Sequence, residues 1–402
     1  MRTKDYIRLQ QTYGAHNYDP LPVVISKAKG VWVWDVEGKK YVDMLGSFSA
    51  INQGHLNSRI VRAATEQMKR VTLTSNAFYN DRMGSFVKKL CEVSGMEMAL
   101  LMNSGAEAVE TAVKLARRYA HQTMDIAEDK GEIIVCEHNF HGRTTTINSF
   151  SSDENSKRGF GPFTPGFAII PYNDIGAFKR AINSNTIGIL AEPIQGEAGV
   201  NIPSPGYLKG LRKVCTEKEI LLMLDEIQTG FGRTGKMFCF QYEGIKPDVL
   251  IVGKSLGGGL YPVSACLSTR KIMSVLDPGS HGSTFGGNPL AVAIAEESLN
   301  VLAEEKLADR ASEMGAYLVA RLREIKSKKI KEIRQKGLLI GVEFHLGPNE
   351  TVRPICEKLM ERGVLSKDAH DRTIRFAPPL VISKKELDWA MERVREVFEG
   401  VD

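Results

Sequence analysis

Residues 220–262 read ILLMLDEIQTGFGRTGKMFCFQYEGIKPDVLIVGKSLGGGLYP and contain the two features that decide the fold. Short apolar runs at 220–224 and 249–252 are each followed by polar residues, with Asp225 after the first run and Lys254 after the second. Runs of this length and composition predict buried strands. Because open α/β sheets bind ligands at the carboxyl ends of their strands, Asp225 and Lys254 are candidates for one shared site.

The alternation of short apolar runs with helical patterns extends over residues 97–300. Further strand-like runs lie at 99–102, 132–136 and 186–191, and apolar residues recur at helical spacing in 106–120 and 207–218. This order of elements is typical of βαβ units. It predicts an α/β fold with a mainly parallel central sheet.

The chain after Pro289 has a different pattern. An alanine- and glutamate-rich stretch predicts one long helix to about residue 325. A strand at 337–344, a helix at 352–362 and a last helix from Ser383 are expected to follow. These elements predict a smaller α+β domain.

The length of the chain favours two domains, because 402 residues exceed what a single hydrophobic core usually organises. We predict a large domain at 47–290 and a small domain at 291–402. Residues 1–46 are expected to form an N-terminal segment that packs with the small domain. Within this segment, residues 31–35 and 40–43 predict a small hairpin.

Composition favours a cytoplasmic protein that acts on small molecules. The net charge is only +5. The basic run KSKKIKEIRQK at 326–336 is interrupted by Glu332 and has no interleaved aromatic residue, so we interpret it as a solvated face. We therefore expect no nucleic-acid partner. No apolar run approaches the ~18 residues of a membrane span, so no membrane partner is expected. The six cysteines form no CxxC pair and are interpreted as small buried hydrophobes in a reducing compartment.

Lys254 has the setting of a lysine that reacts with an aldehyde. It follows a buried run and precedes Ser255 and three consecutive glycines, which leave open backbone around it. Burial lowers the pKa of an amine, and the neutral amine is the form that attacks a carbonyl carbon. Taken alone, the same position also fits a lysine that only marks the end of a strand.

Asp225 at the end of a buried strand needs a cationic partner, because an unpaired buried carboxylate is costly. The protonated nitrogen of a pyridine ring is one such partner, and Gln228 stands three residues further on, where it could contact the phenolic oxygen of the same ring. A helix cap or an internal salt bridge is the alternative interpretation of Asp225.

Two further motifs carry candidate ligand-binding groups. An S-x-x-E capping box is formed by Ser104, Gly105, Ala106 and Glu107. The free N–H groups at such a helix start can bind phosphate.

In the second motif, at 138–143, Phe140 could stack on a planar ring and Arg143 could bind a carboxylate through two hydrogen bonds. Cys136, His138 and His141 could instead be metal ligands. No second cluster with metal-ligand spacing supports that alternative, so no metal is expected.

These motifs together resemble the class III aminotransferases, which are pyridoxal-phosphate enzymes of fold type I, and the resemblance runs essentially from end to end. It is carried by SGAEA at 104–108, NFHGRT at 139–144, EPIQGEAG at 192–199, DEIQTGFGRTG at 225–235, GKSLGGGLYP at 253–262 and HGSTFGGNP at 281–289. Within the family, the resemblance is greatest to the members that use ornithine as amino donor. Four further segments support this: YGAHNYDPLP at 13–22, INQGH at 51–55, LTSNAFYN at 73–80 and IRFAPPL at 374–380.

The resemblance implies a role for each matching residue toward pyridoxal 5'-phosphate. Lys254 would be the Schiff-base lysine and proton shuttle, Asp225 would face the pyridine nitrogen, and Gln228 the phenolic oxygen. Phe140 would stack on the ring. The phosphate would be held by the start of the helix at Ser104, Gly105 and Ala106 and by Thr284 from a second subunit, which implies a homodimer with its active site at the subunit interface.

The resemblance also implies the substrates. The δ-amino group of L-ornithine would pass to 2-oxoglutarate, giving glutamate 5-semialdehyde, which cyclises to pyrroline-5-carboxylate, and glutamate. Glu197 would pair with Arg375 and swing away when the keto acid binds, Arg143 would hold the distal carboxylate, and Tyr18 would contact the α-amino group of ornithine. Phe48 departs from the pattern, because a tyrosine is usual there; the lost hydroxyl removes one hydrogen bond, worth roughly 0.5–1.5 kcal/mol.

Other functions remain as alternatives. Acetylornithine, 4-aminobutyrate or lysine could be the amino donor, and racemases share the fold. A nucleotide-binding loop is suggested by GFGRTGKM at 230–237, but Met237 replaces the Ser or Thr that would hold magnesium, and no helix follows to receive phosphates. A purely structural role would not explain why Asp225, Gln228 and Lys254 cluster at predicted strand ends.

Overall fold

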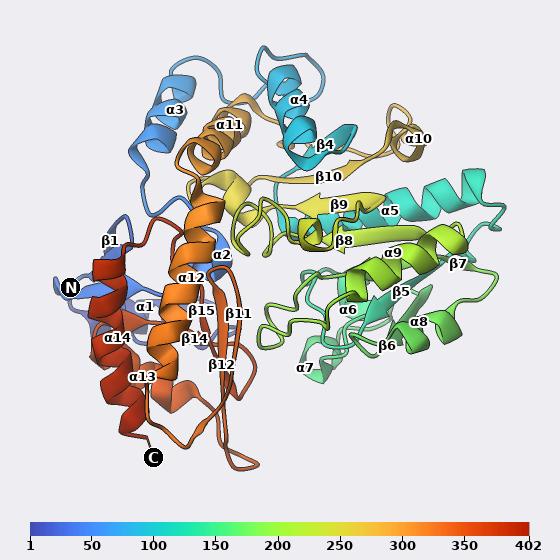
Figure 1. Ribbon diagram of the computed structural model, residues 1–402. Coiled ribbons are helices and arrows are strands. Elements are labelled where there is room, and N and C mark those ends of the chain that lie inside the picture. Colours follow the sequence, from blue (N-terminus) through green and yellow to red (C-terminus); the bar gives the residue numbers. More distant parts are fainter. Residues whose placement is uncertain (402) are drawn as a thin grey trace.

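The computed structural model describes residues 1–401, in which the strands form one large sheet and two small ones (Figure 1). The large sheet has seven strands, in the spatial order β4 (Met98–Met102), β10 (Ser264–Ser268), β9 (Val249–Val252), β8 (Leu221–Asp225), β7 (Thr186–Ala191), β5 (Glu132–Cys136) and β6 (Phe167–Ile170).

The large sheet is mainly parallel, which confirms the predicted fold class. From β9 to β6 all neighbours run parallel, and only β10 is antiparallel to its neighbours β4 and β9. The predicted strands at 132–136, 186–191 and 249–252 have the observed bounds. β8 is displaced by one residue from the predicted 220–224, so that Asp225 is its last residue. Sequence analysis missed β6 and β10.

Helices flank the large sheet and connect its strands (Figure 1). They are α3 (Ser58–Met68), α4 (Met83–Ser94), α5 (Gly105–Thr123), α6 (Thr145–Ser149), α7 (Glu154–Lys157), α8 (Ile175–Ala181), α9 (Tyr207–Glu217), α10 (Arg270–Met273) and α11 (Pro289–Glu304), with 3₁₀ turns η1 (Cys239–Glu243) and η2 (Lys254–Gly257). Every residue of β7, β8 and β9 is buried, as expected for strands covered on both faces.

The N-terminal segment joins the C-terminal part of the chain through a small sheet. Its strands are β1 (Ile25–Lys29), β2 (Trp32–Asp35), β3 (Lys40–Asp43) and β13 (Val364–Leu365). β2 and β3 form the predicted hairpin, and β3 pairs in parallel with β13. The helix α1 (Thr3–Tyr13) precedes this sheet and has no buried residue. The domain boundaries at 46 and 290 stay a prediction, since these pairings bear only on the contact of the N-terminal segment with the C-terminal part of the chain.

The second small sheet is antiparallel and lies with the last helices on the opposite side of the molecule from β6 (Figure 1). Its strands are β11 (Ile330–Lys336), β12 (Leu339–Phe344), β15 (Thr373–Phe376) and β14 (Lys367–Asp368), and its helices are α12 (Leu307–Arg323), α13 (Arg353–Glu361) and α14 (Lys384–Glu399).

The prediction of one long helix after Pro289 was wrong. The helix ends at Glu304, and α12 starts at Leu307 after Lys306 adopts a left-handed φ of 50°. The break separates two packing surfaces, since α11 packs on α3 while α12 packs on α14. Glu304, Glu305 and Lys306 are all good helix formers, so nothing local signals the break.

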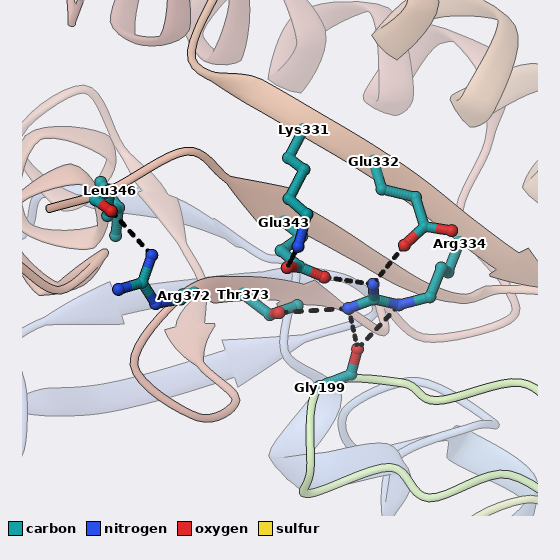
Figure 2. Close-up of polar contacts among 8 residues, drawn as sticks. All are labelled: Gly199, Lys331, Glu332, Arg334, Glu343, Leu346, Arg372 and Thr373. Carbon is teal, nitrogen blue, oxygen red and sulfur yellow. Dashed lines mark hydrogen bonds and ion pairs between the residues drawn. The ribbon is translucent and has the colours of Figure 1, made fainter. Parts of the chain in front are cut away.

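The interpretation of 326–336 as a solvated face was also wrong, because most of it is the half-buried strand β11. Figure 2 shows that its charged side chains form a network: Lys331 pairs with Glu343 at 2.6 Å, and Arg334 pairs with Glu332 at 2.6 Å and with Glu343. Arg334 Nη2 also donates to the carbonyl of Gly199 at 2.8 Å. This contact ties the small sheet to the loop that follows β7.

Arg233 is a second arginine that joins distant segments. Its fully buried side chain donates to the carbonyls of Leu338 at 2.9 Å and Pro378 at 2.7 Å and to Asn52 Oδ1 at 2.5 Å. It forms no ion pair with a carboxylate in residues 1–401. The segment after β8 is thereby bonded to both the N-terminal and the C-terminal parts of the chain.

We expect Arg233→Met to lower the free energy of unfolding by at least about 2 kcal/mol, because it leaves three buried acceptors without this donor. Urea unfolding measures the change. Arg362→Met is the matched control: Arg362 pairs with Glu396 on the surface, where an ion pair contributes about 0–1 kcal/mol. Equal effects of the two variants would contradict this role of Arg233.

Candidate active site

The carboxyl ends of β7, β8 and β9 border a cavity of about 220 Å³. The structure brings seven of the predicted site residues to its wall: Gly105, Ala106, Phe140, Glu197, Asp225, Gln228 and Lys254. The residues come from segments as much as 149 positions apart, from Gly105 to Lys254, so the sheet itself creates the site.

Lys254 lies at the start of η2, directly beyond β9, in a left-handed conformation with φ 47°. A residue other than glycine rarely adopts this conformation, and such exceptions concentrate at functional sites. Burial lowers the pKa of the Lys254 amine, against the opposing effect of the Glu197 carboxylate. The neutral amine that a carbonyl reaction needs is therefore more accessible than in an exposed lysine.

Asp225 has a partner on its own chain that sequence analysis did not assign to it. His141 Nδ1 lies 2.7 Å from Asp225 Oδ2, and the N–H of Ile227 donates to Oδ1 at 3.0 Å. Burial lowers the pKa of His141, but the hydrogen bond to Asp225 and the charges of Asp225 and Glu192 together outweigh this effect, and the pKa is raised overall. His141 is thus a partner of Asp225, whereas Cys136 contacts the Tyr207 hydroxyl at 3.5 Å and His138 is exposed.

Glu192 is a site residue that sequence analysis missed. It directly follows β7 and lines the cavity, and its Oε2 accepts the N–H of Phe140 at 3.1 Å. Burial raises the pKa of Glu192 to about 7; nearby His141 opposes the rise, and Asp225 adds to it. Its position after a buried run, like that of Asp225, was the signal that could have identified it.

Glu197 and Arg375 form an ion pair at the edge of the cavity. Arg375 Nη1 lies 2.8 Å from Glu197 Oε1, and Arg375, on β15, is completely buried. Burial raises the pKa of Glu197, but the charges of Arg375 and Lys254 outweigh it and hold this pKa at about 2. The two residues predicted to form a switch are therefore in contact.

Gln228 connects this ion pair to the cavity. Its Nε2 donates to Glu197 Oε1 at 2.9 Å, and its buried Oε1 has no hydrogen-bond partner among the described residues. A Cβ at Gly196 would lie 1.4 Å from Gln228 Oε1, so only glycine permits this arrangement.

The lining fits pyridoxal phosphate. Asp225 can face a ring nitrogen, Gln228 Oε1 can accept from a hydroxyl, and Lys254 can react with an aldehyde. The N-terminus of α5 supplies N–H groups at Gly105 and Ala106, where the predicted capping box of Ser104 and Glu107 is present.

A second cavity of about 400 Å³ adjoins the first and shares Phe140 and Glu197 with it. Arg143 lines it and donates to Ser156 Oγ at 3.4 Å. Within residues 1–401, the Arg143 guanidinium forms no ion pair. It is therefore available to a ligand carboxylate.

Besides Arg143 and Arg375, four predicted residues lie outside the first cavity. Ser104 only caps α5, and Thr284 is exposed. Tyr18 is 80% exposed and lines a separate hollow beside α1. Phe48 is partly exposed, with its ring centroid 5.0 Å from Arg375 Cζ.

The described chain has neither a cluster of metal-binding side chains nor a helix that could span a membrane. Over residues 1–401, no group of three or more His, Cys, Asp or Glu side chains is placed to hold a metal ion. No helix in the same range combines the length and the apolar character needed to cross a membrane. All six cysteines are free, and all but the half-buried Cys91 are buried, as predicted.

Comparison with known proteins gives consistent results. The family model for class-III aminotransferases matches residues 13–398. An ornithine aminotransferase of Brevibacillus brevis is 57% identical over 397 residues, covering 99% of this chain and 98% of that protein.

Solved structures are also similar. The structure of ornithine aminotransferase from Toxoplasma gondii with partial occupancy of pyridoxal phosphate has a TM-score of 0.97 and 45% identity, and the match covers 100% of this chain and 95% of that one. Acetylornithine aminotransferase from Elizabethkingia anophelis has a TM-score of 0.90 and 43% identity over 99% of each chain.

The raised pKa of Glu192 predicts a pH effect on stability. In the folded chain the Glu192 carboxyl stays protonated up to about pH 7, whereas in the unfolded chain it loses its proton above its ordinary pKa of 4.5. Between about pH 4.5 and 7 the unfolded chain is therefore favoured more and more, and the free energy of unfolding falls as the pH rises. Glu192→Gln removes this loss of stability. In cofactor-free protein, we expect the variant to gain roughly 2 kcal/mol relative to wild type between pH 5 and 7.5, measured by urea unfolding. Parallel pH profiles would contradict the assignment.

Proposed function

This chain belongs to the class-III aminotransferases, and from that membership we propose that it transfers the δ-amino group of L-ornithine to 2-oxoglutarate. The products are glutamate, and glutamate 5-semialdehyde, which cyclises to pyrroline-5-carboxylate. The observation that carries the proposal is the Glu197–Arg375 ion pair beside Lys254. The charge of Arg375 is cancelled while Glu197 is paired with it, and the pocket gains a positive charge when Glu197 moves away.

The cofactor is pyridoxal 5'-phosphate. When bound, it takes up the amino group and draws electrons from the substrate carbon into its ring. Lys254 holds the cofactor through its amine and moves the proton at the reacting carbon. Asp225, kept in place by His141, faces the ring nitrogen, and Gln228 faces the phenolic oxygen. Phe140 stacks on the ring.

The two substrates meet different forms of the pocket. With Glu197 paired, the charge of Arg375 is cancelled and the terminal amine of ornithine can enter. The carboxylate next to the keto group of 2-oxoglutarate instead takes the place of Glu197 on Arg375. Arg143, without an ion pair in the described chain, holds the distal carboxylate in both cases, and Tyr18 contacts the α-amino group of ornithine.

We further propose a cytoplasmic homodimer with its active site at the subunit interface. The support is that Thr284, the predicted phosphate ligand, is exposed and lies outside the cavity of its own chain. A second copy would supply this hydroxyl to the phosphate group, next to the N-terminus of α5.

The alternative donor is N-acetylornithine. The likeness to an acetylornithine aminotransferase and the absence of a hydroxyl at Phe48 favour this alternative. The two donors differ in the charge of the α-nitrogen, so a direct comparison separates them.

Adding L-ornithine alone to protein loaded with pyridoxal phosphate tests the donor. We expect loss of the visible absorption of the bound cofactor and its return on addition of 2-oxoglutarate. N-acetylornithine at the same concentration is the comparison, and faster conversion with it would move the assignment to the acetylated donor.

Lys254→Ala tests the role of the amine. We expect turnover to fall by several orders of magnitude while the unfolding temperature of the cofactor-free protein stays close to that of wild type, because the Lys254 side chain is the reacting group but forms no hydrogen bond or ion pair within residues 1–401. Lys271→Ala, at an exposed position of α10, is the control and should keep turnover. Substantial activity in Lys254→Ala would exclude the proposed chemistry.

A further inference from the structure

The segment α2 (Gly46–Ser49) is a single turn in the left-handed region. The φ angles of Gly46, Ser47, Phe48 and Ser49 are 57°, 47°, 59° and 74°. Glycine adopts this conformation readily, but each of the other three residues is disfavoured in it. Such a run persists only where its surroundings enforce it.

Contacts from both sides hold the turn in place. Asp43 Oδ1 accepts the N–H groups of Leu45 at 3.0 Å and Gly46 at 2.8 Å. A Cβ on Gly46 would lie 2.4 Å from the carbonyl oxygen of Ala377, directly beyond β15. The turn is therefore packed against the strand end that carries Arg375.

The turn presents Phe48 to two site residues. The ring centroid lies 5.0 Å from Arg375 Cζ, and the Phe48 carbonyl accepts from Gln228 Nε2 at 3.3 Å. The same Nε2 donates to Glu197 Oε1 at 2.9 Å. Gln228 is only 8% exposed, so few other acceptors can reach its amide.

We propose that the left-handed turn is a positioning element whose Phe48 carbonyl keeps Gln228 in place when Glu197 leaves Arg375. This inference rests on the proposed function, in which a dicarboxylate displaces Glu197. Once Glu197 has moved, Phe48 O is the acceptor left to the Gln228 amide, and a buried donor without an acceptor is costly. Because the backbone carbonyl carries this role, a ring hydroxyl at position 48 is not needed for it.

Binding of glutarate, an unreactive dicarboxylate, tests the proposal by calorimetry on protein loaded with pyridoxal phosphate. Ser47 is exposed and lines neither cavity, so its substitution acts through the turn. Proline fixes φ near −65° and is incompatible with the turn, whereas valine only disfavours it. We expect the Kd of glutarate to rise roughly tenfold in Ser47→Pro and less in Ser47→Val.

Lys306→Val is the matched control, because Lys306 is also exposed and left-handed but lies between α11 and α12. It should bind glutarate as wild type does. Wild-type affinity in both Ser47 variants would overturn the proposal; if Ser47→Pro does not fold, Ser47→Val alone decides.

The rate of cofactor conversion by ornithine separates this proposal from the proposed function. It should change less in the Ser47 variants than glutarate binding does, since Glu197 stays in contact with Gln228 in that half-reaction. If the Ser47 variants bind glutarate more weakly but the wild-type protein does not convert ornithine, then ornithine is rejected as the amino donor. The positioning role of the turn would still stand.

Discussion

The buried charge of Arg375 is the constraint on which the rest of the site depends. Its guanidinium is completely enclosed, and among the described residues only Glu197 forms an ion pair with it. Removing one partner of a buried pair leaves an uncompensated charge, which costs about 3–5 kcal/mol. In the proposed switch, Glu197 would therefore leave only when another carboxylate takes its place. The selectivity of the proposed switch would follow from this cost, because a ligand without a carboxylate at the reacting end has nothing to offset it.

Hydrogen bonds hold the backbone of the loop that carries Glu197, but leave the Glu197 side chain free to rotate once it is released from Arg375. Arg375 Nη1 donates to the carbonyl of Gly196 at 3.0 Å, and Arg334 Nη2 donates to that of Gly199 at 2.8 Å (Figure 2). Both arginines belong to the small C-terminal sheet. The loop is thus held on either side of Glu197, so the proposed switch would move the Glu197 side chain and leave the loop backbone in place.

Site residues could be predicted from the sequence where a local pattern marks their position in the fold. Asp225 and Lys254 could be placed because buried runs end beside them, and the same pattern would have identified Glu192. The contact of His141 with Asp225 joins residues 84 positions apart and has no local signal. The turn at 46–49 was equally hidden, since three of its four residues are not glycine and its conformation is imposed by Asp43 and the chain beyond β15.

Charge also limits how the phosphate of the cofactor can be held. Near the cavity, His141 is paired with Asp225 and Arg375 with Glu197, so these side chains already compensate one another. Of the lysines and arginines described, only Lys254 lines this cavity, and Arg143 lies in the adjoining one. On this chain, the N-terminus of α5, whose dipole and free N–H groups favour an anion, is the group left to meet the phosphate charge. This shortage of free cations is a second argument for the proposed second subunit, beside the Thr284 hydroxyl.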